Sequence, residues 1–183
     1  VFRQAMESLI VANAHRIVNG EYPILDSKDS DFFFLSRENL LSALTTVVDL
    51  YTKRLPKAYG YNSISDIQII CPSRKGELGT VALNRALQQL LNPPSKDKDE
   101  LVSGGKIIRE GDKVMQIKNN YDIVWTKGKT TSSGIYNGDI GTVLAVNHTN
   151  RFMKIEFDDR VAIYPFENAK ELEHAYAVTV HKS

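Results

Sequence analysis

The stretch DIQIICPSRKGELGTVALNRALQQL, residues 66–90, places a strand, a polar loop and a helix in immediate succession. Residues 67–71 form an apolar run of strand length, and Leu83 and Leu87 recur at helical spacing. Thr80, at the start of this helix, is expected to be its N-cap. The succession is typical of α/β folds, in which ligands bind beyond the ends of the strands. We therefore expect an α/β domain, with a candidate binding loop between the strand and the helix.

Segments before this unit favour the same fold class. Apolar side chains recur at helical spacing over residues 5–18 and again over residues 40–55. The run Phe-Phe-Phe-Leu at residues 32–35 predicts a short buried strand between these helices. Cys71, the only cysteine, ends the strand of the opening stretch. We expect it to be a buried thiol, since a single cysteine forms no disulfide within the chain.

Short strands with two-residue alternation dominate the second half of the chain. We predict five of them, at residues 113–117, 122–126, 141–146, 152–157 and 161–165. Asn-Gly-Asp and Asp-Asp turns separate several of these strands. Their close succession predicts a small closed β-barrel. The apolar run at residues 175–180 is expected to return to the α/β sheet, so that the barrel is an insertion.

Two polar segments are interpreted as exposed to solvent. Residues 94–100 are rich in Lys and Asp and lack large apolar side chains, which predicts a connector and not a binding patch. Residues 127–134 are rich in Gly, Ser, Thr and Lys, which predicts a mobile loop.

The composition restricts the function classes. The 183 residues carry a formal net charge of only +1 at pH 7, so a nucleic-acid partner is not indicated by charge alone. No apolar stretch approaches the roughly 18 residues of a membrane helix, and no signal peptide is visible, which favours a cytoplasmic protein without a membrane partner. The sequence starts at Val1 and stops at Ser183 within a strand-like pattern, so we expect a piece of a longer protein.

Four stretches, taken together and in order, resemble the RecD/TraA group of superfamily-1 DNA helicases, which includes the alpha chain of exodeoxyribonuclease V. They are FRQA with the nearby NAH, DIQIICP leading into KG and LN, GDKVMQ with NNYD and NGDIG, and AYAVTVHKS, within residues 2–15, 66–84, 111–141 and 175–183. The resemblance implies a C-terminal fragment that ends within motif V. Its fold class would be α/β, a second RecA-like motor domain of the P-loop NTPase type with a parallel sheet, over residues 1–107 and 170–183. A small Src-homology-3-like β-barrel would be inserted over residues 108–169.

The resemblance also implies a nucleotide site to which this chain contributes. Arg3 corresponds to the motif IV arginine that reaches the γ-phosphate, and a permanently charged guanidinium suits this catalytic task. Gln4 would support the same ATP site, although a local hydrogen bond explains it equally well. The sequence contains no Gly-x-x-x-x-Gly-Lys-Ser/Thr loop and no strand that ends in paired acidic residues. ATP and Mg²⁺ are therefore expected in the intact protein and not on the fragment alone, and no protein-bound metal site is expected.

Polar and aromatic residues at strand ends are the candidates for contact with single-stranded DNA. They are Ser73, Arg74, Lys75, Gly76, Asn119, Asn120, Tyr121, Thr179, His181, Lys182 and Ser183. A loop with a hydroxyl, two cations and a glycine can approach a phosphate closely, and an aromatic ring can stack on a base. Backbone N–H groups at Thr80 would add donors for an anion. The alternatives are a solvated loop, an asparagine turn and an ordinary strand end. For Trp125, barrel core and DNA stacking are equally compatible with the sequence.

The leading functional hypothesis is a fragment of an ATP-dependent DNA helicase. In the intact protein, ATP hydrolysis would be coupled to translocation along single-stranded DNA and to duplex unwinding, whereas the fragment alone would be inactive as an ATPase. The implied partners are single-stranded DNA, the N-terminal RecA-like domain of the same chain and, in a nuclease complex, other exonuclease V subunits. The alternative is a non-catalytic nucleic-acid- or protein-binding module built on the β-barrel.

Overall fold

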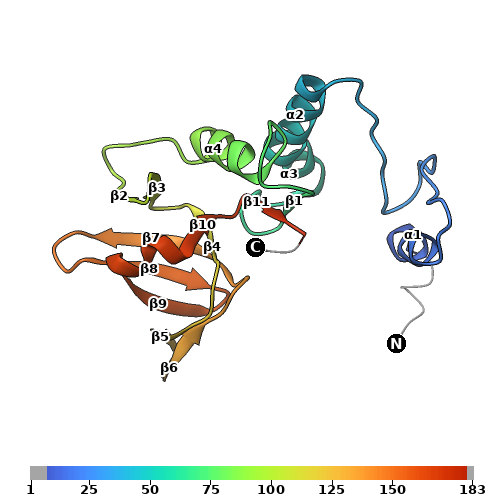
Figure 1. The fold of residues 1–183 in the computed structure, drawn as a ribbon. Helices are drawn as coiled ribbons and strands as arrows, with labels where there is room; N and C mark the ends of the chain where they lie inside the picture. The colour runs from blue at the N-terminus through green and yellow to red at the C-terminus, as the bar shows by residue number, and fades with distance from the viewer. Residues whose placement is uncertain (1–7, 181–183) are drawn as a thin grey trace. The chain divides into compact units, whose positions relative to one another are not determined.

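The structure, a computed structural model, describes residues 8–180 (Figure 1). The chain divides into two compact units, Val1–Asn39 and Leu40–Ser183. Two groups of predicted site residues lie outside the described residues. They are Arg3 and Gln4 at the start of the chain, and His181, Lys182 and Ser183 at its end.

The first unit contains one helix, α1 (Leu9–Val18), over its described residues, which confirms the predicted helix from residue 9 onward. Asp31 accepts hydrogen bonds from the backbone N–H groups of Leu9 (2.8 Å) and Ile10 (3.2 Å), at the positive end of the helix dipole. A hydrogen bond from the Ser8 hydroxyl, together with these backbone bonds, lowers the pKa of Asp31. The start of the helix is therefore fixed by a carboxylate from the segment that follows it.

The predicted buried strand at residues 32–35 is wrong. The segment is irregular, and Phe33, Phe34 and Leu35 are 59%, 54% and 47% exposed. A strand needs a partner for its backbone N–H and C=O groups, and the described part of this unit contains no second strand. Hydrophobicity alone was therefore an insufficient guide to strand formation.

Within residues 40–180, the second unit contains four α- or π-helical segments in addition to its strands. They are α2 (Leu40–Asp49), the π-helical turn η1 (Leu50–Arg54), α3 (Leu55–Tyr59) and α4 (Thr80–Leu91). The first three are continuous, which confirms the helix predicted over residues 40–55. They end where Gly60 adopts a left-handed conformation, with φ at 72°. Among residues 8–180, no helix combines the length and apolar character needed to cross a membrane.

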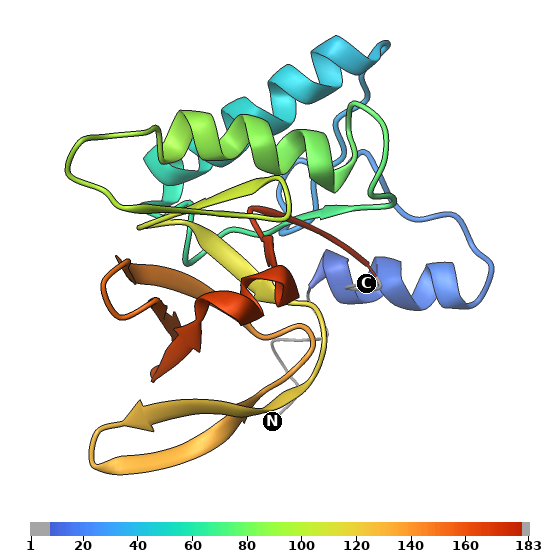
Figure 2. The same ribbon diagram turned by 60° about the vertical axis from the view of Figure 1, so that its left-hand side comes forward.

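Most strands of the second unit form one antiparallel sheet with the order β10-β4-β7-β8-β9-β5-β6 (Figures 1 and 2). Its strands are β4 (Lys113–Gln116), β5 (Asn120–Lys127), β6 (Thr130–Ile135), β7 (Ile140–Asn147), β8 (Phe152–Phe157), β9 (Arg160–Pro165) and β10 (Leu172–His174). The 3₁₀ turn η2 (Phe166–Glu171) connects β9 to β10. The alternation in β8 is strict, because Met153, Ile155 and Phe157 are fully buried and the residues between them are exposed. These side chains belong to the core of the sheet.

Two small sheets complete the unit. β1 (Ile69–Cys71) pairs in parallel with β11 (Ala177–Thr179), which confirms that the last apolar run returns to the strand of the opening stretch. Cys71 is buried, also as predicted. The hairpin of β2 (Glu100–Ser103) and β3 (Lys106–Arg109) was not predicted. Its two strands follow the predicted connector at residues 94–100 and overlap it only at Glu100.

The expected RecA-like motor domain with a parallel sheet is wrong. Within residues 8–180, parallel pairing is limited to β1 and β11, whereas seven strands join in the antiparallel sheet. The period-two pattern of the second half therefore determines the main architecture, and the apolar runs of the first half do not build a parallel sheet around β1. The antiparallel sheet does fit a Src-homology-3-like domain. The proposed boundaries at residues 107/108 and 169/170 remain a prediction.

The predicted mobile loop at residues 127–134 is also wrong. Thr130–Ile135 form β6, which pairs with β5 through Thr126 opposite Thr131 and Trp125 opposite Ser132. β-Branched threonines favour extended structure, and cross-strand pairs stabilise it. β6 is a polar strand at the edge of the sheet, and its composition resembles that of a loop, which explains the wrong prediction. Figure 2 shows β5 and β6 as a long ribbon at the lower edge of the sheet.

Candidate nucleic-acid interface

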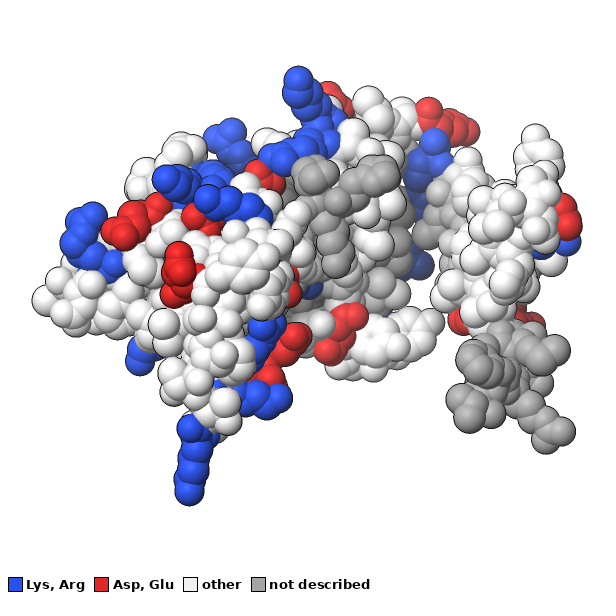
Figure 3. All heavy atoms as spheres, turned by 60° about the horizontal axis from the view of Figure 1, so that its bottom comes forward, with Lys and Arg blue, Asp and Glu red and all other residues white. Residues whose placement is uncertain are grey.

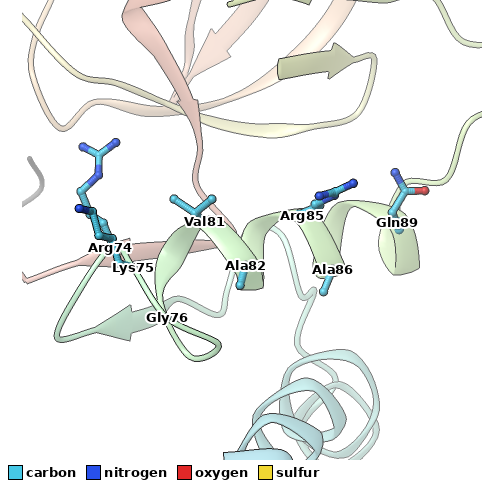
Figure 4. A pocket seen from close by; sticks show the side chains of 8 residues that line it. All are labelled: Arg74, Lys75, Gly76, Val81, Ala82, Arg85, Ala86 and Gln89. Atoms are coloured by element: carbon cyan, nitrogen blue, oxygen red, sulfur yellow. The ribbon is translucent and has the colours of Figure 1, made fainter. Parts of the chain in front are cut away.

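A shallow groove lies along α4 and the loop that precedes it (Figure 4). Its volume is about 690 Å³, and it is lined by Arg74, Lys75, Gly76, Val81, Ala82, Arg85, Ala86 and Gln89. Side chains four residues apart lie on the same helix face, so Val81, Arg85 and Gln89 follow one another along the groove. Ala82 and Ala86 also line the groove, with small side chains. The groove contains three of the predicted contact residues.

The loop is held against the first turn of α4 by its own backbone. The carbonyl oxygen of Ser73 accepts from the N–H of Thr80 (3.2 Å), and that of Arg74 accepts from Val81 (3.3 Å). The Ser73 hydroxyl donates to the carbonyl oxygen of Lys75 (2.9 Å). Ser73 therefore orders the loop, which is a structural role. The N–H of Thr80 is already occupied, so the expected anion donor at this position is wrong, and the N-cap is Gly79 and not Thr80.

Gly79 allows the close approach of loop and helix. A Cβ atom at this position would lie 2.5 Å from the carbonyl oxygen of Lys75 and 2.6 Å from that of Arg74. Gly76, at the turn of the loop, has φ at +91°, which favours glycine. Two glycines thus set the path of the backbone around the groove.

Replacement of Gly79 by alanine is expected to destabilise the second unit by about 1–3 kcal/mol, because backbone atoms must move to accommodate the methyl group. Urea denaturation of both forms measures the difference. Glu77→Ala, an exposed change in the same loop, is the control and is expected to stay within about 0.5 kcal/mol of the wild type. Equal stability of Gly79→Ala and the wild type would show that the loop opens without cost.

The three cations at the groove differ in their partners. Arg74 forms a salt bridge with Glu173 on β10, with a distance of 2.5 Å between guanidinium nitrogen and carboxylate oxygen. Lys75 and Arg85 are exposed, and neither forms a salt bridge or a side-chain hydrogen bond within residues 8–180. These two cations are therefore available to an anionic ligand, whereas Arg74 links the loop to the sheet. Arg85 was missed from the sequence, although its spacing of four residues from Val81 and Gln89 marks it.

On the face drawn in Figure 3, Lys and Arg are interspersed with Asp and Glu and form no large patch of one sign. This distribution agrees with the net charge of +1. Any electrostatic attraction for a polyanion must therefore come from local groups such as Lys75 and Arg85.

Thr179 lies close to the groove. It is half-buried on β11 and lines a narrow crevice together with Arg74, Asn84 and Glu173. The structure thus brings the predicted contact residues of the opening stretch and of the last strand into one region. Residues of β10 and β11 form the side of the crevice on which Thr179 lies.

The asparagines of the third predicted cluster have structural roles. Asn119 accepts a hydrogen bond from the backbone N–H of Asn137 (2.9 Å), and Asn120 donates to the carboxylate of Glu171 (2.8 Å). Tyr121 is 64% exposed and contacts Tyr136 edge to face. This cluster shares no lining residue with the groove. Neither asparagine has a left-handed backbone and Asn120 belongs to β5, so the turn interpretation does not describe them. Their side chains form hydrogen bonds within the fold, whereas the ring of Tyr121 is exposed.

Trp125 packs against the core of the sheet. Its indole N–H donates to the carbonyl oxygen of Gly134 (3.2 Å), and the guanidinium of Arg160 lies 5.7 Å from its ring centre. The ring is half-buried. Of the two alternatives for Trp125, the structure supports the core role.

A buried polar cluster, here called the Asp112 cluster, links α4 to the sheets and was not predicted. Asp112 is fully buried, and its carboxylate contacts Gln88 (2.6 Å), Asn92 (2.8 Å), the N–H of Arg109 (2.8 Å), His174 (3.1 Å) and Tyr176 (2.9 Å). These partners come from α4, its C-cap, β3, β10 and the segment before β11. One carboxylate therefore anchors the helix that carries the groove to two strands, β3 and β10, and to the segment before β11.

Burial alone would raise the pKa of Asp112. Hydrogen bonds from His174 and Asn92 outweigh this effect and hold the pKa below its ordinary value. Burial and the charge of Asp112 raise the pKa of Tyr176, so its hydroxyl remains a donor. Asp112 is thus an ionised acceptor surrounded by hydrogen-bond donors, the arrangement that makes a buried carboxylate stable.

Comparison with known proteins supplies a family context for these features. Residues 83–157 match a family profile described as "ATP-dependent RecD-like DNA helicase SH3 domain". The chain is 28% identical over all 183 residues to the protein named "ATP-dependent RecD2 DNA helicase" of Deinococcus radiodurans, and covers 22% of its length. It is 32% identical over 139 residues to the uncharacterized protein MJ1519 of Methanocaldococcus jannaschii, a match that covers 64% of this chain and 11% of that protein. The chain thus spans less than a quarter of either relative.

Proposed function

Because the chain belongs to the RecD-like family of DNA helicases, we propose that it contacts single-stranded DNA within an ATP-dependent helicase. In the intact protein, ATP hydrolysis would drive translocation along the strand and unwinding of the duplex. The observation that carries the DNA contact is the presence of two cations, Lys75 and Arg85, at the groove on α4, neither of which forms an ion pair within residues 8–180. Phosphate groups are the part of DNA that such cations bind without regard to sequence.

The groove suits the sugar-phosphate backbone of a single DNA strand that passes through it. Lys75 and Arg85 would neutralise phosphates, and the glycine turn at Gly76 lets the strand approach the loop closely. Arg74, although paired with Glu173, remains 45% exposed and would add a third, weaker contact. Thr179 lies beside Arg74, and His181, Lys182 and Ser183 follow it in the sequence as proposed contacts.

Within residues 8–180, the loop and first turn of α4 do not offer free N–H groups at Thr80 and Val81 to a nucleotide phosphate. The first N–H groups of α4 are bonded to loop carbonyls, and no group of three or more His, Cys, Asp or Glu within residues 8–180 is arranged to hold a metal ion. In line with the resemblance, the proposal places ATP and Mg²⁺ on other parts of the intact protein. The proposed contribution of Arg3, with Gln4, to that ATP site rests on the resemblance of the sequence. Residues 108–169 are proposed as a separate Src-homology-3-like unit of this helicase.

The double substitution Lys75→Gln/Arg85→Gln is expected to weaken binding of a labelled oligothymidylate and to flatten its salt dependence. Two lost phosphate contacts reduce the slope of log K against log salt by about 1.4, since each contact on single strands contributes roughly 0.7. Fluorescence anisotropy over a salt series, with the whole 183-residue chain, measures both quantities.

The matched control is Lys96→Gln/Lys154→Gln, which removes two exposed positive charges away from the groove. This variant is expected to keep most of the affinity and of the slope. If both double variants lower the slope equally, DNA follows no particular path, and the groove is not the binding site. If the wild-type chain binds no oligonucleotide at low salt, the proposed function itself is contradicted.

A further inference from the structure

Tyr121 and Tyr136 form an exposed aromatic pair at the base of the β5–β6 hairpin. Their ring centres are 5.8 Å apart, and the ring planes meet at 73°. Tyr121 is 64% exposed and Tyr136 is 44% exposed. Asn120 pairs with Ile135 across the two strands, so the tyrosines are diagonal neighbours on one face of the hairpin. Two large rings therefore present an open corner to solvent.

The backbone holds Tyr136 in this position. A Cβ atom at residue 134 would lie 2.8 Å from the Tyr136 hydroxyl, so the phenol ring lies over a glycine. Gly134 has φ at +106°, a conformation that glycine adopts readily, and its carbonyl oxygen accepts from the Trp125 indole. The N–H of Tyr136 donates to Asp139 (3.1 Å). The position of the ring is thus fixed by the local fold and not by a hydrophobic core.

Polar groups border the corner. The side-chain oxygen of Asn119 accepts from Asn137, whereas its amide nitrogen donates to no other group within residues 8–180. An aromatic corner bordered by an amide donor has the components that bind a base.

We propose that Tyr121 and Tyr136 form a stacking site for an unpaired base of single-stranded DNA. The base would lie with its face on one ring and its edge toward the other. In a duplex, neighbouring bases cover these faces, so the site selects unpaired strands. Every base has a π-face, so the site tolerates any sequence. This inference rests on the proposed function, and it adds base contacts to the phosphate contacts of the groove.

The geometry favours a base over a proline-rich peptide. Proline-rich segments dock in grooves between aromatic walls, whereas rings that meet at 73° form a corner. A flat ring fits a corner, because edge-to-face and face-to-face contacts are both favourable for aromatic groups.

The test compares an oligothymidylate with an abasic strand of equal length, which carries the same phosphates without bases. The whole wild-type chain is expected to bind the oligothymidylate at least about fivefold more tightly. Tyr121→Ala/Tyr136→Ala is expected to remove this preference and to leave affinity for the abasic strand unchanged. Tyr121→Phe/Tyr136→Phe, which keeps the rings, is expected to retain the preference. Tyr22→Ala, at the most exposed large hydrophobic side chain of the described residues, is the matched control.

The outcomes separate this inference from the proposed function. If wild-type chain binds both strands equally, and Lys75→Gln/Arg85→Gln still weakens binding, the stacking site is contradicted while the groove stands. Loss of the preference in the Tyr→Phe variant also overturns stacking. Binding of a proline-rich peptide at the tyrosines, without a preference for bases, assigns the corner to a protein partner and overturns the inference. No binding of either strand overturns both proposals.

Discussion

Asp112→Ala is expected to lower the free energy of unfolding of the second unit by about 3–5 kcal/mol. The wild-type carboxylate is the shared acceptor of the Asp112 cluster. Its removal leaves the Tyr176 hydroxyl without its acceptor and takes one acceptor each from the amides of Gln88 and Asn92, which keep their bonds to backbone carbonyls. Each unsatisfied buried group costs about 1–3 kcal/mol. Relaxation and entry of water offset part of this sum. The change is therefore larger than that expected for an exposed site.

Urea denaturation followed by the fluorescence of Trp125, the only tryptophan, reports on the unit that contains the cluster. Asp97→Ala, at an exposed turn, is the control and is expected to change stability by less than about 0.5 kcal/mol. A loss below about 1 kcal/mol for Asp112→Ala, with an unchanged dependence on urea, would mean that the donors of the cluster find other partners easily.

Glu171→Gln is expected to cost up to about 3 kcal/mol at neutral pH, the free energy that corresponds to a pKa lowered from 4.5 to about 2, and to remove part of the acid sensitivity. Glu171 is 4% exposed, and burial alone would raise its pKa. Hydrogen bonds from Asn120, Lys118, Asn168 and Gln116 lower the pKa from 4.5 to about 2. A folded-state pKa below the ordinary value means that the ionised carboxylate stabilises the fold above pH 4.5. This contribution is lost as the pH falls from about 4.5 toward about 2.

Stability measured in urea at several pH values checks this prediction. The difference between wild type and Glu171→Gln is expected to be largest at neutral pH and to shrink below pH 4.5. Glu167→Gln, an exposed change in the same turn, serves as the control and is expected to follow the wild type at every pH. A difference that does not depend on pH would assign the effect to packing and not to the ionised carboxylate.

Strict side-chain periodicity made several elements predictable. The strand predicted at residues 152–157 coincides with β8, because Met153, Ile155 and Phe157 alternate with polar residues. α4 was recognisable from the spacing of Leu83 and Leu87, both of which are buried. In these elements, local pattern and tertiary burial agree, so the sequence alone is sufficient.

Elements whose state depends on distant partners were not predictable. The run at residues 32–35 is apolar enough for a core strand but is not in a strand, whereas the polar segment Thr130–Ile135 is a strand because β5 pairs with it. Asp112 is a charged residue within a turn-like Gly-Asp pair, and its complete burial follows from donors that lie up to 64 residues away. Sequence patterns indicate which residues prefer burial, but they do not show where partners for buried charges will be.

The candidate site was predicted in part. The loop with Arg74, Lys75 and Gly76 does line a groove, but Arg85 was not recognised and Arg74 turned out to be engaged with Glu173. The sequence marked Tyr121 as a candidate for stacking but not its partner Tyr136. Fourteen residues separate the two, and eight of these, residues 127–134, had been interpreted as a loop. The sequence did not show which cations are paired or which strands lie side by side. These two properties explain the missed site residues.

The parallel pair of β1 and β11 has a consequence for the order of folding. Its register joins Ile69 to Ala177, which are 108 residues apart. Closing a flexible loop of that length costs about 4 kcal/mol of chain entropy, which three pairs of residues cannot supply. Once the antiparallel sheet has formed from its shorter-range hairpins, the two strands are held near each other and the remaining cost is small. The pair therefore closes late, after the sheet between its strands has assembled.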